Sequence, residues 1–404
     1  MTRIRVAKGI ALTILIAFGV MEICATKVVA ASKHKHKAST GVPQFVYDPS
    51  FPKQEGHFGD EGNWIYGALG GIAVDPTNNH VWILQRPGTL TEPELLGSTK
   101  PPIDDCCVSA PTVMEFDSEG HFLQGWGGPG QGYDWPEIEH GIRIDYKGNI
   151  WIGGSGKKDN QLLKFTQSGK FLLQIGHPGK SAGSVDTENM NVPASTYVYP
   201  KANEVFVADG YVNRRVIVFD ADSGAFKRMW GAYGKAPDDS VPRIKRFPQT
   251  EGLPLETVVK DPPPQQFNLP HAILVSNDGL VYVGDRTNNR VQVFKVDGSF
   301  VTEVFVERNF LGPVGTAVDL GFSPDPEQRF LYVMSGDEHL RILDRQSLKI
   351  VGQFGRLGHL AGQFWHTHAI AVDSKGNIYT AEAGTAGRRV QKYLFKGFSP
   401  VPAH

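Results

Sequence analysis

Short apolar runs, in which apolar and polar residues alternate, repeat along the chain from Gly70 onward, and turns rich in Gly, Asn and Asp separate them. The clearest stretch has four such runs, at residues 272–275, 280–283, 291–294 and 300–305. A period of two is the period of a β-strand with one buried face. The pattern therefore predicts units of four antiparallel strands joined by tight turns.

The four-run unit occurs six times, and the units begin near Gly70, His140, Ala194, His271, Val318 and His368. Fixed-period self-similarity with four strands per repeat is the sequence pattern of propeller blades. We therefore predict an all-β fold, a six-bladed β-propeller. The fifth unit is the least regular, because residues 319–324 replace its usual first strand.

The last unit reaches only residues 390–394 and lacks a fourth run, whereas residues 44–48, before the first unit, read as a strand. An unpaired edge strand is a liability that natural folds avoid. We expect the N-terminal strand to complete the last blade and close the ring. The propeller would then span residues 44–396, followed by a tail at 397–404.

The first 31 residues have the three parts of a secretory signal: basic residues near the start, an apolar run over residues 9–21, and small residues at Ala30 and Ala31. The apolar run is too short to span a bilayer comfortably. We therefore predict that residues 1–31 are removed, that no stable membrane insertion remains, and that the protein is secreted or periplasmic. Residues 32–43 would form a polar, basic tether.

Charge and cysteine content narrow the class further. The 41 basic and 42 acidic residues give a net charge of −1, which disfavours nucleic acid or an anionic membrane as a partner. Cys106 and Cys107 are adjacent in a chain predicted to be exported, where thiols tend to be oxidised. A disulfide between them and a bond to another molecule both stay open, and we expect no catalytic role for the pair.

Three histidines, His140, His271 and His368, stand at the same register, at the start of the first run of units two, four and six. In a propeller this run lines the central channel, and alternate blades of a six-fold ring are about 120° apart. Three inward imidazoles would therefore converge on the axis. Three protein nitrogens with an open fourth position is the arrangement of a catalytic zinc.

The alternative is that each histidine is capped or solvated, which is the commoner fate of a single histidine at a strand start. Three at one register, on alternate blades only, favour a metal site. His366, two residues before His368, should point the other way along the strand and is not expected to be a ligand.

The repeat resembles the NHL-repeat family over about residues 67–395. The resemblance rests on residues 131–142, on residues 362–364 before His368, and on turns that run from Asp209 to Arg215 and from Asp285 to Arg290. It implies a propeller of the NHL or TolB type. It also implies that the Asp and Arg of each turn pair to hold the blade together, so we interpret these four residues as structural.

Within this group the chain resembles the peptidyl-α-hydroxyglycine α-amidating lyases, zinc-dependent propellers that finish the C-terminal amidation of peptides. The matching stretches are residues 71–76 with Asn78, Asn79 and Arg86, His140-Gly141 with residues 145–151, Asp209-Gly210-Tyr211 with Asn213 and Arg215, residues 269–271, and His368. The resemblance implies that His140, His271 and His368 bind zinc, and that Arg86 and Tyr211 are catalytic.

The implied substrate is a small molecule or peptide that ends in a carbinolamide, R–CO–NH–CH(OH)–COO⁻, and separates into an amide and glyoxylate. Zinc would lower the pKa of the substrate hydroxyl. Tyr211 could act as the base or relay the proton, and Arg86 could grip the carboxylate with its planar fork. Each has a plainer alternative: Tyr211 as a rim aromatic, and Arg86 as a brace for the insertion that follows it.

Two positions depart from the lyase pattern. Ala369 replaces the aspartate that helps to hold a structural calcium in the family, so calcium here would rely on backbone carbonyls such as those of Ile72 and Ile142. Val212 replaces the cysteine of the Asp-Gly-Tyr-Cys turn, so that disulfide is absent. A copper monooxygenase domain is also missing from the sequence, so a hydroxylated substrate would have to come from elsewhere.

Two other functions stay open. A propeller hydrolase of the lactonase or esterase type would need an acidic base near the axis, for which Asp319 and Glu139 are the candidates. A non-enzymatic NHL scaffold would bind a partner without metal. Long insertions at residues 89–110, 180–192 and 235–266 could cover the channel mouth, and their partner is not readable from the sequence.

Overall fold

The computed structural model describes residues 41–53, 64–105, 107–243 and 262–400, and the regular secondary structure of this part of the chain is nearly all β-strand. Four short 3₁₀ segments interrupt it: η1 (Pro87–Thr89), η2 (Glu92–Ser98), η3 (Ala232–Gly234) and η4 (Arg286–Asn288). In the described ranges we find no helix with the length and apolarity needed to cross a membrane. The secretory signal and most of the tether predicted above lie outside the described residues.

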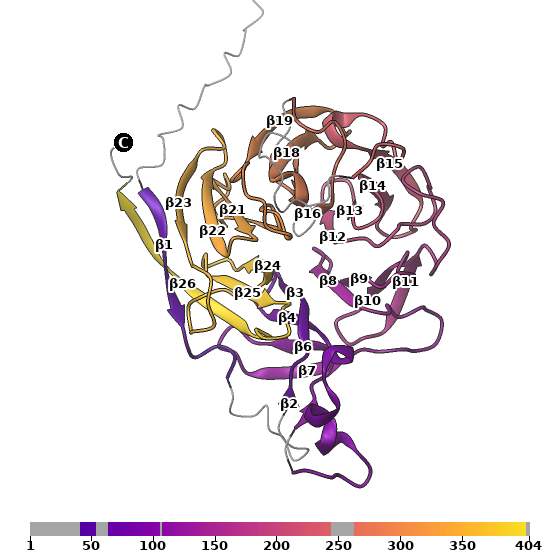
Figure 1. Cartoon of the computed structure of the whole chain (residues 1–404), viewed down its shortest axis with the longest axis vertical. Helices are drawn as coiled ribbons and strands as arrows, with labels where there is room; N and C mark the ends of the chain where they lie inside the picture. Colours follow the sequence, from indigo (N-terminus) through magenta and orange to yellow (C-terminus); the bar gives the residue numbers. More distant parts are fainter. Residues whose placement is uncertain (1–40, 54–63, 106, 244–261, 401–404) are drawn as a thin grey trace, which may run out of the picture. The chain divides into compact units, whose positions relative to one another are not determined.

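Six antiparallel sheets of four strands each form the blades (Figure 1). From the inner to the outer strand, blade 1 is β3 (Ala68–Val74), β4 (Val81–Arg86), β6 (Val113–Phe116) and β7 (Phe122–Trp126), and blade 2 is β8 (Glu139–Ile144), β9 (Ile150–Gly154), β10 (Leu162–Phe165) and β11 (Phe171–Ile175). Blade 3 is β12 (Ser195–Tyr199), β13 (Glu204–Asp209), β14 (Arg215–Asp220) and β15 (Phe226–Trp230), and blade 4 is β16 (Pro270–Val275), β17 (Leu280–Asp285), β18 (Arg290–Lys295) and β19 (Phe300–Phe305). Blade 5 is β20 (Asp319–Phe322), β21 (Phe330–Ser335), β22 (His339–Asp344) and β23 (Ile350–Phe354), and blade 6 is β24 (Thr367–Val372), β25 (Ile378–Glu382), β26 (Val390–Pro400) and β1 (Gly41–Asp48).

The innermost strands close a ring. Each one contacts the innermost strand of the next blade, and β24 of blade 6 contacts β3 of blade 1. The core lies between the sheets: Trp82 of blade 1 packs with Ile152 of blade 2, and Trp151 of blade 2 packs with Val205 of blade 3. The six-bladed propeller predicted from the repeat is confirmed.

The N-terminal strand completes the last blade, as predicted. β1 pairs antiparallel with β26, from Gly41 opposite Pro400 to Asp48 opposite Lys392. Both strands are longer than expected, since β1 begins at Gly41 and β26 runs to Pro400. Residues 41–43 and 397–400 are therefore blade residues, not tether or tail.

Blade 5 is more regular than its sequence suggested. The stretch expected to replace its first strand contains β20, which pairs antiparallel with β21 from Asp319 opposite Met334 to Phe322 opposite Leu331. In place of an Asn-Arg turn, Arg341 forms an ion pair of 2.5 Å with Asp337. The blade therefore keeps a charge pair of the usual type at a shifted position.

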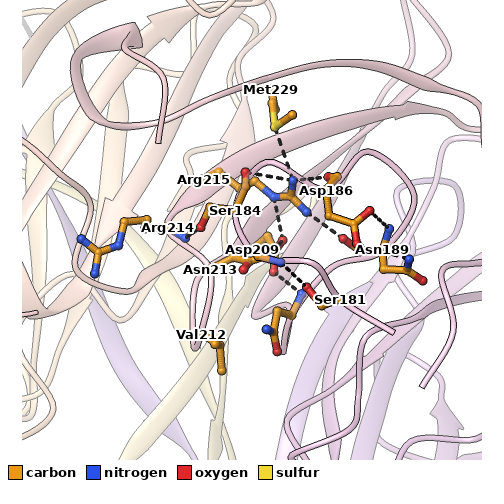
Figure 2. Close-up of polar contacts among 12 residues, drawn as sticks. Ser181, Ser184, Asp186, Asn189, Asp209, Val212, Asn213, Arg214, Arg215 and Met229 are labelled. Carbon is orange, nitrogen blue, oxygen red and sulfur yellow. Dashed lines mark hydrogen bonds and ion pairs between the residues drawn. The ribbon is translucent and has the colours of Figure 1, made fainter. Parts of the chain in front are cut away.

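The Asp–Arg pairs expected to hold blades 3 and 4 are present and fully buried. Arg215 Nε lies 2.9 Å from Asp209 Oδ2, and Arg290 Nε lies 2.8 Å from Asp285 Oδ2. Figure 2 shows that Arg215 also donates to backbone carbonyls of the insertion before blade 3, among them those of Ser184 and Asn189. A buried charge is tolerable only when it is paired and hydrogen-bonded in this way.

The insertion after β4 pairs with the segment that precedes the first strand of blade 1. Residues Trp64–Ile65 (β2) pair in parallel with Val108–Ser109 (β5). Cys107, directly before β5, is disulfide-bonded, and Cys106 lies outside the described residues. The sequence left the state of this pair open, and the structure gives Cys107 a disulfide.

Candidate metal centre

A β-bulge lies at each of the three histidines. In β8 the register with β9 shifts between His140 and Ile142, in β16 it shifts across His271, and in β24 it shifts across His368. A bulge inserts one unpaired residue and re-aims the side chain beside it. β12 and β20, the inner strands of blades 3 and 5, carry no histidine and pair with their neighbours without a shift.

Blade 1 has the same bulge, between Leu69 and Gly71, but no side chain there. A Cβ at Gly70 would lie 2.7 Å from the Glu139 carbonyl oxygen, and one at Gly71 would lie 2.9 Å from the Ile142 nitrogen. Neither position can carry a side chain without displacing the backbone of blade 2. Blade 1 therefore contributes no side chain to the cluster at this register.

The three imidazoles converge as predicted. His140, His271 and His368 are buried, and their nearest ligand atoms all lie within 4.8 Å of one another. The rings stand edge to face, with centroids 4.5 to 5.2 Å apart and interplanar angles of 84° to 89°. Among the histidine, cysteine and acidic side chains of the described residues, these three histidines form a group that could hold a metal ion.

Hydrogen bonds to neighbouring blades fix two of the rings. His140 Nδ1 lies 2.9 Å from the Ala194 carbonyl oxygen, and His271 Nδ1 lies 2.6 Å from the Val318 carbonyl oxygen. A carbonyl only accepts, so each Nδ1 carries the proton and each Nε2 presents a lone pair, the tautomer of a metal-bound histidine. His368 Nδ1 is buried and has no hydrogen-bond partner.

Burial keeps the cluster uncharged. It is the main cause that lowers the pKa of each of the three histidines well below 6.5. The charges of Arg86 and Arg286 lower these pKa values further. At neutral pH the site is a set of three neutral imidazoles, which is the protonation state that a metal requires.

The Tyr211 hydroxyl completes the cluster from the turn between β13 and β14. Tyr211 Oη lies 2.9 Å from His140 Nε2 and 3.0 Å from His271 Nε2. Both nitrogens are acceptors, and one hydroxyl has one hydrogen, so it cannot satisfy both. The donor set therefore has a surplus of lone pairs, which a divalent cation such as zinc would satisfy.

Arg86 reaches the site from the end of β4. Its Nε donates to the Glu139 carbonyl oxygen at 2.6 Å. Burial lowers the pKa of Arg86, and the charges of Tyr211 and Glu139 oppose this. The guanidinium is therefore held among the metal-site residues, close to Tyr211 and Glu139.

Arg286, which the sequence analysis did not identify, is a second cation at the site. Its Cζ lies 5.8 Å from the centroid of the Tyr211 ring, and its Nε is buried without a hydrogen-bond partner. Its correspondence with Arg86 becomes visible only once the hydrogen bonds of the two blades are known. The side chain of Gln85 accepts a hydrogen bond from Gly67 N, and the side chain of Asp285 accepts one from Asn268 N, in the same place of blades 1 and 4. The residues that follow, Arg86 and Arg286, therefore occupy equivalent positions in the two blades.

The equivalent positions belong to blades 1 and 4, which lie opposite each other in a ring of six. The two guanidinium groups therefore approach the histidine cluster from opposite sides. Two cations beside a neutral metal site are suited to a small anion such as a carboxylate.

His366 is not part of the cluster, but it is closer to it than its strand position suggested. It is exposed, and its positive φ of 53° turns the chain just before β24. Although part of the side chain is open to solvent, desolvation of the rest lowers its pKa, and so do the charges of Arg286 and Arg86. His366 therefore lies close enough to both arginines for their charges to act on it.

Below the histidines, the channel contains a cavity of about 30 Å³ lined in part by Ile72, Ile142, Arg143, Asp319 and Ala369. This volume holds roughly one or two waters. Both oxygens of Asp319 accept backbone N–H groups, from Leu320 and Ile370. Calcium needs six to eight oxygen ligands.

Asp319 is the one acidic residue among those that line the cavity, so calcium there would depend largely on backbone carbonyls. Arg143, whose Nε donates to the Thr196 carbonyl oxygen, adds a fixed positive charge to the same cavity wall. Among the causes that shift the pKa of Asp319, burial raises it to about 6 and the Arg143 charge opposes this. The backbone sites at Ile72 and Ile142 stay a prediction that the residues around them do not favour.

Comparison with known proteins agrees with the fold. The family model described as NHL repeat matches residues 267–294, which cover β16, β17 and most of β18. Human NHL repeat-containing protein 3 is 27% identical over 338 residues, which are 80% of this chain and 78% of that protein.

Two further relatives are named for the amidation reaction. A probable peptidyl-alpha-hydroxyglycine alpha-amidating lyase of Caenorhabditis elegans is 23% identical over 326 residues, or 78% of this chain and 80% of that protein. The peptidylglycine alpha-amidating monooxygenase of Rattus norvegicus is 28% identical over 367 residues, or 83% of this chain and 32% of that protein. The chain is therefore a six-bladed β-propeller with an NHL repeat, and it resembles the peptidyl-α-hydroxyglycine α-amidating lyases at low identity.

Proposed function

We propose that the protein is a zinc-dependent lyase that cleaves a C-terminal carbinolamide into an amide and glyoxylate. The observation that carries the proposal is the Tyr211 hydroxyl, which contacts two of the three converging histidines between two opposed arginines. His140, His271 and His368 would hold the metal. When bound, zinc supplies a Lewis acid that makes a substrate hydroxyl more acidic.

Tyr211 has the reach and the chemistry of a proton relay. In the reaction, the hydroxyl O–H bond breaks, the C–O bond becomes a carbonyl, and the C–N bond breaks with its electron pair on nitrogen. Tyr211 Oη takes the hydroxyl proton and gives its own proton to the leaving nitrogen. The products are R–CO–NH₂ and glyoxylate, and no water is consumed.

Arg86 and Arg286 are the groups suited to the substrate carboxylate. A guanidinium binds a carboxylate with two parallel hydrogen bonds, and burial strengthens that contact. Because the two arginines flank the cluster from opposite blades, a carboxylate held by either one would place the adjacent carbinol carbon over the histidines. Binding would thus orient the C–N bond toward Tyr211.

The direct test is glyoxylate release from α-hydroxyhippurate by the zinc-loaded mature protein, with benzamide measured as the second product. Equal amounts of the two products, both abolished in His271→Ala, are expected. Failure to release glyoxylate from a protein that holds one zinc per chain would refute the reaction while leaving the metal site intact.

A hydrolase is the second candidate, and Asp319 favours it, because this carboxyl lines the cavity directly below the histidines. Hydrolysis consumes water, so a lactone or ester substrate in H₂¹⁸O would give a labelled product. The lyase reaction would leave both of its products unlabelled by the catalytic step.

A non-enzymatic scaffold would bind no metal and would tolerate His140→Ala.

A further inference from the structure

The turn that carries Tyr211 is held weakly by its own neighbours. Tyr211 N donates to the Val192 carbonyl and Val212 N donates to the Asn191 carbonyl, both at the long distance of 3.3 Å. Val212 is 51% exposed, so it adds little packing. The hydroxyl nevertheless has to stay within hydrogen-bond distance of two histidines on different blades.

A guanidinium from the insertion before blade 4 grips this turn. Arg243 donates through Nη1 to the Gly210 carbonyl at 3.3 Å, and through Nη2 to the carbonyls of Val212 and Asn213, the latter at 2.6 Å. The bonds fall on both sides of Tyr211. A planar fork that binds three carbonyls of one turn fixes its orientation as well as its position.

The charge that makes these bonds strong is retained at neutral pH. Burial and the charge of Arg214 lower the pKa of Arg243 to about 10. The neighbouring carboxylates of Asp285, Asp239 and Asp209 oppose that shift. Charge-assisted hydrogen bonds of this kind are about twice as strong as neutral ones.

The segment that bears Arg243 is itself anchored to the other side of the turn. Asp239 accepts from Ser184 N at 2.8 Å and from Ser184 Oγ at 2.6 Å, and Ser184 Oγ accepts from Arg214 N at 3.0 Å. Figure 2 shows Ser184, Val212 and Asn213 grouped around Arg214 and Arg215. Two insertions, before blades 3 and 4, therefore converge on the turn between them.

We propose that Arg243 is a positioning residue for Tyr211, and that the insertions before blades 3 and 4 brace the catalytic turn with hydrogen bonds. The inference rests on the proposed function, since it assumes that Tyr211 takes part in the reaction. It gives the described part of the 235–266 insertion a role in the catalytic step.

The test is a double-mutant cycle on the full mature chain. Arg243→Met is expected to lower kcat roughly 10- to 100-fold with KM changed less than about twofold, because misplacing a catalytic group costs rate. In the Tyr211→Phe background, the same change is expected to lower kcat less than about twofold. Arg329→Met, which removes a guanidinium paired with Asp325 in blade 5, serves as the matched control and should leave kcat unchanged.

Three kinetic results would overturn the proposal: an unchanged kcat in Arg243→Met, a raised KM with unchanged kcat, or an equal loss of kcat in the Tyr211→Phe background. Arg243→Lys keeps the charge but loses the fork, so an intermediate kcat is expected. If Arg243→Met does not fold, Arg243→Lys carries the same cycle, and its kcat must fall less in the Tyr211→Phe background than in wild type.

A readout independent of activity separates this inference from the reaction itself. With 3-fluorotyrosine in all 12 tyrosines, the Tyr211 resonance is assigned by its loss in Tyr211→Phe. In Arg243→Met this one ¹⁹F resonance should shift or broaden while the others stay. If that resonance moves in a protein that releases no glyoxylate, Arg243 positions Tyr211 but the lyase reaction is rejected. If the resonance does not move, the positioning role of Arg243 is rejected.

Discussion

Tyr211 Oη lies 2.9 Å from His140 Nε2, and the two residues come from adjacent blades, 71 positions apart in the chain. The contact joins the candidate proton relay to the candidate metal site. Because the two side chains touch, a substitution of either residue is expected to alter the environment of the other.

Removing one histidine should remove the metal. Wild type is expected to bind about one zinc per chain, and His271→Ala should bind less than a tenth of that, because two imidazoles do not make a protein zinc site. Elemental analysis of the purified mature protein measures this. His177→Ala, which changes an exposed histidine outside the cluster, should keep full zinc content; loss of zinc in that control would point to a different site.

The arginines should act on binding, and charge alone should not replace them. Arg86→Lys and Arg286→Lys are each expected to raise KM for α-hydroxyhippurate roughly 10–100-fold, because a lysine cannot form the two parallel bonds of a guanidinium. Steady-state kinetics at fixed pH gives the answer. An unchanged KM in Arg286→Lys would remove that residue from the site.

Calcium removal should leave stability unchanged. Arg143 supplies a positive charge in the cavity wall, and both oxygens of Asp319 already accept backbone hydrogen bonds. Dialysis against a calcium-selective chelator is expected to change Tm by less than about 1 °C. A drop of several degrees that added calcium reverses would show that the carbonyls of Ile72 and Ile142 do hold the ion.

Asp319 should make the protein less stable as the pH rises. Its pKa is about 6 in the fold and lower when unfolded, so between about pH 4 and pH 6 the folded state binds more protons. Stability from this group is present below about pH 4 and is lost through pH 6, by at most about 3 kcal/mol. Urea unfolding from pH 4 to pH 7 should show this loss in wild type relative to Asp319→Asn. Parallel curves for the two proteins would contradict the assignment.

The fold could be predicted because each blade repeats one alternation of apolar and polar residues, and because the missing strand of the last unit had a counterpart near residue 45. The three histidines could be placed because their register is visible in the sequence. In blade 5, turn residues that looked irregular hid β20, since only pairing with β21 identifies a strand of four residues.

What the sequence could not show depends on backbone geometry. The bulges at His271 and His368 appear only when strand pairing is known. Arg286 looked like part of an ordinary turn until its register with Arg86 was visible. The role of Arg243 depends on contacts with carbonyls 30 to 33 residues away, and no side-chain pattern encodes those.

Closure of the ring by β1 and β26 sets an order of events. β1 is near the start of the chain, β26 is its last described strand, and blade 6, which they complete, carries His368 on β24. During synthesis, the first strand must wait without its partner until nearly the whole chain has emerged. The third imidazole belongs to the same late blade, so the set of three histidines is complete only after the last inner strand, β24, has been made.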